Sequence, residues 1–254
     1  MKTSLFAAFV MLFLLAQDSA AGGEASSPQT GFFSTTRLAT DMLGDRAGTY
    51  GELFEPDEEI TWQYYVPSAY RPDNAAGLLV YISPTRSGTM PKEWRSVMDE
   101  RNIIWIGADQ SGNRTRVPRR ILLSLLAVDL ARLDYAVDER RVFLSGFSGG
   151  ARVASMAAMD HPRIFKGGLF FCGADLWDLA SSSDMDIIRG NRYALITGTS
   201  DQALESVKRT YRGYRKAGIN NTRLMIVRNM GHNTPRRSDF AKAIAFLDQG
   251  RSAE

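Results

Sequence analysis

Seven short segments of the chain are rich in apolar and aromatic residues and predict β-strands. Residues 61–66 alternate in the manner of a strand with one buried face, whereas the other six segments are continuous apolar runs. Short continuous runs are typical of strands that are buried on both faces of a parallel sheet. The six runs are residues 78–82, 103–106, 142–144, 168–171, 193–196 and 224–227.

Helical periodicity occupies three of the gaps between these runs. Leucines recur at helical spacing over residues 118–136 and predict a helix with one stripe facing the core. Similar spacing predicts a second helix that ends near Gly218 and a third near the C-terminus, with Ser238 as its cap. The three stripes consist of Leu122, Leu125, Leu126, Leu130 and Leu133; of Leu204, Val207 and Tyr211; and of Phe240, Ile244 and Leu247.

The repeated order of strand, helix and strand predicts the fold class. It implies a mostly parallel sheet with helices on both faces, which is a three-layer α/β/α sandwich. No internal repeat or low-complexity linker divides residues 22–254, so we expect a single domain there. Residues 22–30 are small and polar, and we expect them to form a mobile N-terminal arm.

The first 21 residues have the pattern of a secretory signal peptide. Lys2 supplies a positive start, and residues 5–16 form an unbroken apolar run that is too short to span a bilayer comfortably. Ser19 and Ala21 are small residues suited to cleavage before Gly22. The sequence therefore predicts a secreted or periplasmic protein, with an uncleaved N-terminal anchor as the alternative.

Composition excludes several other classes of protein. Apolar residues make up 44% of the 254 residues, which is too high for a disordered chain. The single cysteine, Cys172, allows no internal disulfide and lies in an apolar run, which predicts a buried small side chain. The net charge of +3 does not by itself indicate nucleic-acid binding. No later stretch approaches the roughly 20 apolar residues of a membrane-spanning helix, so we expect no stable membrane span.

A serine-containing turn carries the strongest chemical signal. Gly146, Ser148 and Gly150 form the pattern G-x-S-x-G between the predicted strand at 142–144 and a following alanine-rich, helix-like segment. A nucleophile elbow needs such a strand-to-helix turn, because a strained serine then projects its hydroxyl above the sheet edge. Larger side chains two residues before and after the serine would clash in that turn. The alternative is a glycine-rich turn in which Ser148 only caps the helix.

A serine hydroxyl needs a base, and the chain has two histidines. His161 follows the helix that starts at Ser148, and a rise of about 1.5 Å per residue carries it some 15–20 Å from the turn. His232 follows the last apolar run on a Gly-containing loop, so it can reach the carboxyl-end rim of the sheet. The sequence therefore predicts His232 as the base, and a neutral imidazole implies activity that rises through roughly pH 6–7.

The base in turn needs a carboxylate to orient it. Asp201 follows the run at 193–196 and Gly198, which places it at the carboxyl end of the next-to-last strand. Asp175, after the preceding strand, is the second candidate, and Asp201 could instead only cap the following helix. The order Ser148, Asp201, His232 is the one expected of an α/β-hydrolase.

From about residue 60 to 248 the chain resembles the α/β-hydrolase superfamily in strand order, elbow, acid and histidine. Residues 146–150, 174–177, 198–201 and 231–232 are similar to segments of secreted esterases related to feruloyl esterases and polyhydroxyalkanoate depolymerases. The resemblance implies that Ser148 is the nucleophile, His232 the base and Asp201 the orienting acid. It also implies that the Gly149 N–H is one oxyanion donor.

The second oxyanion donor normally comes from the loop after the third strand, where family members commonly carry His-Gly. This chain has residues 83–88 there instead, and Pro84 has no N–H to donate. We therefore expect Thr85 to supply the second donor, with Arg86 as the next candidate.

These features predict a secreted serine hydrolase that cleaves carboxylic esters through an acyl-enzyme on Ser148, without a cofactor or metal. The expected partner is a small-molecule or polymeric ester and not a nucleic acid. Two alternatives stay open: a peptidase or acyltransferase with the same triad, and a non-catalytic binding protein on the same fold.

Overall fold

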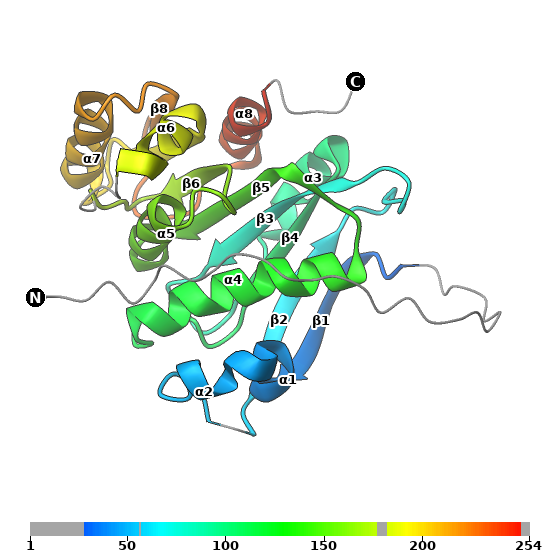
Figure 1. The fold of residues 1–254 in the computed structure, drawn as a ribbon. Coiled ribbons are helices and arrows are strands. Elements are labelled where there is room, and N and C mark those ends of the chain that lie inside the picture. The colour runs from blue at the N-terminus through cyan, green and yellow to red at the C-terminus, as the bar shows by residue number, and fades with distance from the viewer. Residues whose placement is uncertain (1–27, 56, 177–181, 250–254) are drawn as a thin grey trace, which may run out of the picture.

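The computed structural model describes residues 28–55, 57–176 and 182–249, and these form one eight-stranded sheet with helices on both faces (Figure 1). The predicted signal peptide, and residues 22–27 of the predicted arm, lie outside the described residues. The strands are β1 (Gly31–Leu38), β2 (Glu59–Val66), β3 (Ala76–Ile82), β4 (Ile103–Ala108), β5 (Val137–Phe147), β6 (Gly167–Phe171), β7 (Arg192–Gly198) and β8 (Thr222–Val227).

The sheet is mostly parallel, as predicted. Its strand order is β1-β2-β4-β3-β5-β6-β7-β8, and only the pairs β1–β2 and β2–β4 are antiparallel. The parallel strands β3 to β8 therefore end at one common edge, where the loops that follow them meet. All seven predicted strands are present, and β1 is an additional edge strand that the apolar pattern did not indicate.

Two helical layers enclose the sheet, which confirms the predicted three-layer sandwich. One apolar core joins the sheet to α1, α4, α5, α6 and α7, and the other joins its opposite face to α3 and α8. The helices are α1 (Ala39–Leu43), α2 (Ala47–Tyr50), α3 (Arg95–Arg101), α4 (Val117–Asp134), α5 (Gly149–Asp160), α6 (Ser182–Gly190), α7 (Leu204–Lys216) and α8 (Arg237–Asp248), with short 3-10 turns at Gly44–Arg46 and Lys92–Trp94.

The predicted core-facing stripe of α4 is wrong at Leu133, whose side chain is 72% exposed. Ser124 and Ala127 line the contact with β3 and β4, so small side chains on another face of the helix let it approach the sheet. Leu133 follows the buried Ala131 by two residues, and a turn of about 200° directs it away from the sheet.

The predicted cap of the last helix is also wrong. Ser238 is the second residue of α8, and Arg236 stands in extended conformation at the cap position without a side-chain cap. Tertiary contacts hold this helix entry instead. The Trp94 indole N–H donates to the Pro235 carbonyl oxygen (3.1 Å), and Arg237 pairs with Glu100 (2.8 Å).

The described helices include none that is both long and apolar enough to cross a membrane.

Candidate active site

Ser148 occupies a strained turn between β5 and α5. Its φ of 53° and ψ of −119° lie outside the regions that L-residues commonly adopt, and its N–H donates to the Phe171 carbonyl oxygen (2.8 Å) on β6. A Cβ on Gly146 would lie 2.5 Å from the backbone of Gly150, and one on Gly150 would lie 2.0 Å from the Ile82 carbonyl oxygen. Both glycines are therefore needed for the close approach at this turn, as their spacing predicted.

The structure brings the three predicted catalytic side chains into one hydrogen-bonded chain. His232 Nε2 lies 2.8 Å from Ser148 Oγ, and His232 Nδ1 lies 2.7 Å from Asp201 Oδ1. An ionised carboxylate can only accept, so Nδ1 carries the proton and Nε2 is left to accept from the serine hydroxyl. This tautomer is the one that a general base requires.

Asp201 is anchored as an acceptor from several sides. Its side chain is fully buried, and it accepts from the Ala203 N–H (2.8 Å) and the Thr197 hydroxyl (2.7 Å) as well as from His232. Burial alone would raise the pKa of Asp201, but hydrogen bonds from Cys172, Ala203, His232 and Thr197 outweigh it and lower the pKa below its ordinary value. The acid is thus held in its charged form beside the imidazole.

The second candidates from the sequence lie elsewhere. Asp175 forms an exposed ion pair with Arg152 (3.0 Å). His161 follows the last residue of α5, where its N–H donates to the Ala157 carbonyl oxygen (3.0 Å), and burial lowers its pKa. The rise of a helix along α5 separates it from Ser148, as the length of the predicted helix required.

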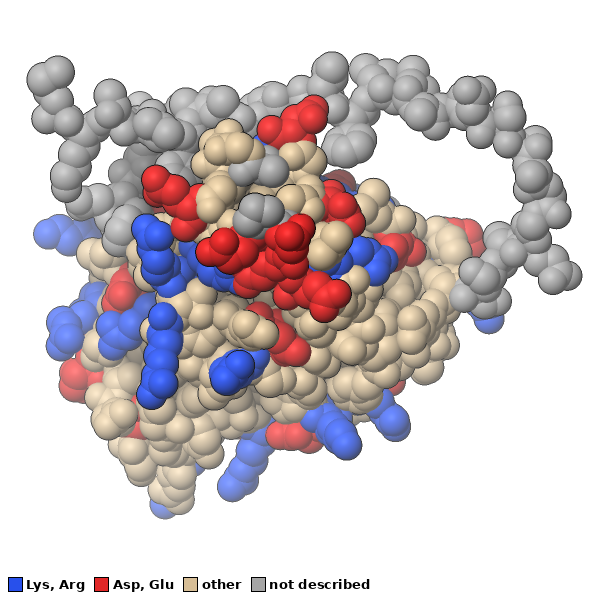
Figure 2. Space-filling model, turned by 90° about the horizontal axis from the view of Figure 1, so that it is seen from below, with Lys and Arg blue, Asp and Glu red and all other residues tan. Residues whose placement is uncertain are grey.

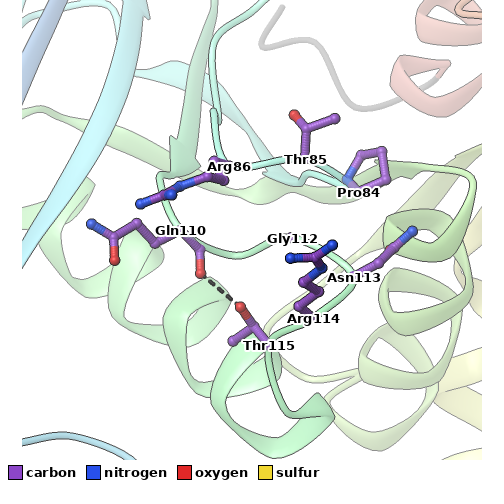
Figure 3. Close-up of a pocket in the computed structure, with 8 residues that line it drawn as sticks. All are labelled: Pro84, Thr85, Arg86, Gln110, Gly112, Asn113, Arg114 and Thr115. Carbon is purple, nitrogen blue, oxygen red and sulfur yellow. Dashed lines mark hydrogen bonds between the residues drawn. The ribbon is translucent and has the colours of Figure 1, made fainter.

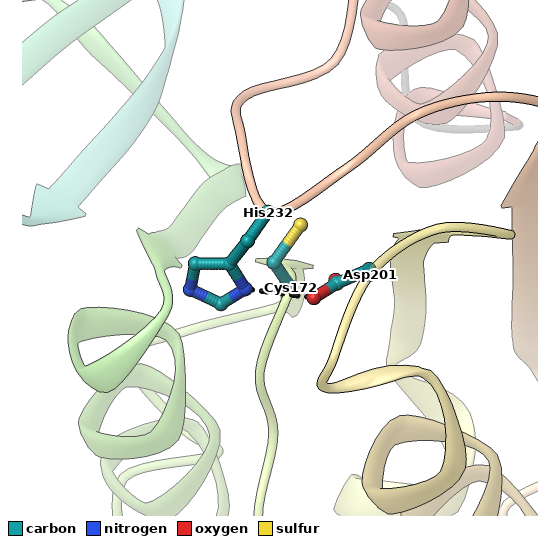
Figure 4. A group of neighbouring side chains, drawn as sticks. All are labelled: Cys172, Asp201 and His232. Atoms are coloured by element: carbon teal, nitrogen blue, oxygen red, sulfur yellow. Dashed lines mark hydrogen bonds and ion pairs between the residues drawn. The ribbon is translucent and has the colours of Figure 1, made fainter.

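Cys172 is buried, as predicted, but its place behind the acid was missed. It follows β6 and lies between Asp201 and the His232 loop (Figure 4), and its sulfur is 3.3 Å from the Asn233 carbonyl oxygen. Burial raises the pKa of this thiol, so it stays protonated. The strand order could have predicted this position, because β6 lies between β5 and β7 and ends at the same edge of the sheet.

Cys172, Asp201 and His232 also offer three potential metal-ligand atoms within 4.8 Å of one another. These atoms are engaged with each other and with Asn233, and the protonated thiol is a poor ligand. The arrangement is therefore better suited to fixing a histidine than to holding an ion.

Two loops approach the position where an oxyanion would form. The Gly149 N–H is the first of α5 and has no carbonyl partner within the helix. The Thr85 N–H donates to Ser83 Oγ (3.1 Å), so the sequence-based assignment of Thr85 as second donor stays a prediction. The side-chain amide of Asn113 lies against Gly149, because a Cβ there would be 2.2 Å from Asn113 Oδ1 and 2.9 Å from its Nδ2.

Asn113 was not singled out as a site residue from the sequence. It lies on the loop after β4, and its N–H donates to the Pro84 carbonyl oxygen (3.0 Å) on the loop after β3. That cross-loop bond depends on β3 and β4 being neighbours in the sheet, which the linear pattern of apolar runs does not reveal.

No protein-family model matches the chain, and no curated protein matches it in sequence. Solved structures do resemble it. A ferulic acid esterase superposes with a TM-score of 0.65 at 13% identity, over 87% of this chain and 98% of that one. A thermostable esterase matches with a TM-score of 0.53 at 14% identity, over 78% and 55%.

Esterase 2 of Thermogutta terrifontis, phosphorylated by paraoxon, matches with a TM-score of 0.55 at 17% identity, over 76% of this chain and 88% of that one. At such identities the likeness concerns the fold, and the chain has the α/β-hydrolase fold.

Proposed function

We propose that the protein is a serine hydrolase that cleaves carboxylic esters through an acyl-enzyme on Ser148. The observation that carries this proposal is the continuous chain from Asp201 through His232 to Ser148, with its 2.7 Å and 2.8 Å contacts. A strained serine at a strand-to-helix turn adds to it, since that geometry exposes the hydroxyl for attack.

In the acylation step, Ser148 Oγ attacks the ester carbonyl carbon while its proton passes to His232 Nε2. Asp201 stabilises the imidazolium that forms and keeps Nδ1 protonated. The tetrahedral intermediate then collapses, and His232 returns the proton to the departing alcohol oxygen. In deacylation, water gives a proton to Nε2 while its oxygen attacks the acyl carbon. The bond from that carbon to Ser148 Oγ then breaks, His232 returns the proton to Oγ, and the carboxylic acid leaves.

The negative charge on the carbonyl oxygen requires donors at a fixed position. In our proposal the Gly149 N–H is the first donor, supported by its place at the start of α5. Two groups compete for the second role: the Thr85 N–H, now bonded to Ser83, and Asn113 Nδ2, which lies beside Gly149. Loss of kcat in Asn113→Ala with little change in KM would favour the amide; an unchanged kcat would favour Thr85.

We favour an ester as the substrate class because several structures of the same fold are esterases by name. A putative dipeptidyl aminopeptidase IV from Bacteroides ovatus also shares the fold, with a TM-score of 0.58 at 16% identity over 35% of that chain, which keeps a peptide as the alternative. The triad alone does not show whether the substrate is an ester or a peptide. It also does not show whether water or another acceptor takes the acyl group. The peptidase and acyltransferase alternatives are therefore tested together with the first proposal, as is a binding protein without catalysis.

A fluorophosphonate probe tests the nucleophile directly, and reaction of the Thermogutta esterase with paraoxon supports this choice of reagent. We expect labelling of the wild type and of Ser206→Ala, a control serine on α7, but none of Ser148→Ala. Labelling of Ser148→Ala would refute the assignment, and an unlabelled wild type would favour a binding protein. Turnover of nitrophenyl esters and of matched nitroanilides would then rank esterase against peptidase.

Export of the protein is part of the proposal and is supported by residues 1–21 alone. Expression of the full chain with its own N-terminus, followed by mass measurement of the mature protein, should give a species that starts at Gly22. Recovery of the full-length chain in the membrane fraction would favour the anchor instead.

A further inference from the structure

A cleft of about 540 Å³ opens beside the nucleophile turn. It lies between the loop after β3, at residues 84–86, and the loop after β4, at residues 110–115 (Figure 3). Its volume falls in the range of small-molecule sites. Asn113 belongs both to the wall of this cleft and to the contact with Gly149, so only one side chain separates the cleft from the residue after the nucleophile.

The two loops are fastened to each other. The Gln110 N–H donates to the Arg86 carbonyl oxygen (2.6 Å), and the Asn113 N–H donates to that of Pro84 (3.0 Å). A Cβ on Gly112 would lie 2.8 Å from the Thr85 carbonyl oxygen, so a glycine is needed where the loops touch. The cleft is therefore a built feature of the fold whose walls are held by tertiary contacts.

Two arginines, one from each loop, line this cleft. Arg86 and Arg114 are exposed, and within the described residues neither has a carboxylate partner. The acid nearest to Arg114 in sequence, Asp109, already accepts from the Gly88 N–H (2.8 Å) and from Gln63 Nε2 (2.7 Å). The described residues that line the cleft include no acidic one. Two positive charges without a carboxylate partner among the described residues thus line the cleft whose wall, at Asn113, contacts Gly149.

Several arginines on α4 and α5 differ from these two because each has a carboxylate partner. Arg119 pairs with Glu58 and Arg132 with Glu139, and Arg152 pairs with Asp175. Seen from below, acidic side chains gather in the middle of the face and several basic ones on its left (Figure 2), the side on which α4 begins in Figure 1. On this face the charges are therefore partly segregated, with several basic side chains toward the side on which α4 begins.

We propose that this cleft binds a carboxylate of the substrate, so that the preferred esters carry a negative charge on the acid or on the alcohol side. The expected preference for anionic esters rests on the proposed function, whereas carboxylate binding by the cleft does not. Guanidinium groups bind carboxylates through paired, charge-assisted hydrogen bonds. The remaining lining groups include the side-chain amides of Gln110 and Asn113, which add further hydrogen-bond donors.

Matched esters test the proposal and separate the two possible positions of the charge. On the acid side, the 4-nitrophenyl monoester of glutarate is compared with 4-nitrophenyl pentanoate. On the alcohol side, 4-carboxyphenyl butyrate is compared with phenyl butyrate. The enzymes are the wild type, Arg86→Gln, Arg114→Gln, the double variant and Arg71→Gln, an exposed arginine outside the cleft.

We expect a higher wild-type kcat/KM for the anionic member of at least one pair. Each cleft substitution should lower that value about tenfold, from the strength of a charge-assisted hydrogen bond. The neutral esters should change less than about twofold, Arg71→Gln should behave as wild type, and added salt should reduce the preference. The pair that shows the effect assigns the side of the ester that the cleft binds. Equal loss on neutral and anionic esters, or no loss, would overturn the proposal.

A binding measurement keeps the inference distinct from the catalytic one. Glutarate should raise the melting temperature of Ser148→Ala, and the cleft double substitution on that background should abolish the shift. No ester turnover together with an arginine-dependent glutarate shift would refute the proposed hydrolase but support the carboxylate site. Ester turnover without charge preference and without a shift would refute only the carboxylate site.

Discussion

Replacement of Asp201 by asparagine isolates the charge of the proposed triad from its geometry. Two of the three hydrogen bonds with known distances, from His232 Nδ1 and the Ala203 N–H, end on the same oxygen, Oδ1, and the Thr197 hydroxyl donates to Oδ2. The Ala203 N–H would oppose an amide NH₂ at the Oδ1 position. The introduced asparagine is therefore expected to keep its oxygen there and turn its NH₂ toward Thr197, whose hydroxyl can rotate to accept.

In this arrangement the histidine keeps its tautomer and loses only the negative charge that stabilises the imidazolium. Two unit charges about 4 Å apart interact by about 4 kcal/mol at an effective dielectric constant of about 20. That energy corresponds to a factor of about 10³ in rate. Asp201→Ala also frees the imidazole to rotate and to change tautomer, so its loss should approach about 10⁴.

The assay is kcat/KM for a short nitrophenyl ester, with circular dichroism and thermal melting as checks on folding. Asp175→Asn is the matched control, because Asp175 follows the neighbouring strand β6 and forms an exposed ion pair with Arg152. It should retain activity within about twofold, as expected for a surface ion pair. Asp201→Asn with more than a tenth of wild-type activity, or Asp175→Asn with an equal loss, would refute the reasoning.

Three further outcomes concern stability. Gly150→Ala should lower the free energy of unfolding, measured by urea titration, by about 2 kcal/mol or more, because the new Cβ would lie 2.0 Å from a backbone oxygen. Gly190→Ala is the control and should cause no such loss, because no atom lies within 4 Å of its added Cβ. Asp248→Ala should cost about 3–5 kcal/mol, because it leaves the buried Arg141 guanidinium without its 2.6 Å partner; a loss below about 1 kcal/mol would contradict this. Folding lowers the pKa of Asp201, so the charged carboxylate stabilises the folded state at pH values above about 4, the pKa of an aspartate in the unfolded chain. This stabilisation is lost as the pH falls further. The free energy of unfolding of Asp201→Asn should therefore decrease less than that of the wild type between about pH 5 and 3.

Most of the parallel part of the sheet was predictable because β3, β4, β6 and β7 are buried on both faces, which leaves continuous apolar runs in the sequence. The parallel edge strand β8 also has an apolar run, although it is partly exposed. Edge strand β1 has no such run: half of its sequence, GFFSTTRL, is polar, its residues alternate between half-buried and exposed from Gly31 to Thr36, and Arg37 and Leu38 are exposed. It is held by pairing with β2 along its whole length, from Gly31 opposite Val66 to Leu38 opposite Glu59. Backbone pairing of this kind leaves little trace in hydrophobicity.

The residues proposed for the triad were predictable for a similar reason. Each follows a recognisable strand, and parallel strands end at one edge, so chain order translated directly into proximity. The surroundings of the triad were not predictable, because they depend on which loops are neighbours. Asn113 reaches Gly149 only because β4 lies beside β3 and the two following loops are hydrogen-bonded to each other.

The strand order also explains why a small buried thiol stands behind the acid. Ser148, Cys172 and Asp201 follow β5, β6 and β7, which are consecutive in the sheet, so whatever follows β6 must fit between the nucleophile and the acid. Ser148 and Cys172 both have positive φ, at 53° and 51°, so the chain turns sharply at two neighbouring strand ends. A larger side chain at position 172 would displace either the carboxylate or the loop that carries His232, since the thiol already contacts Asn233 there at 3.3 Å. Ser148 and His232 are 84 residues apart in sequence, yet their side chains lie 2.8 Å apart. The order of the strands and the small size of Cys172, between the ends of β5 and β7, therefore set the distances within the proposed triad.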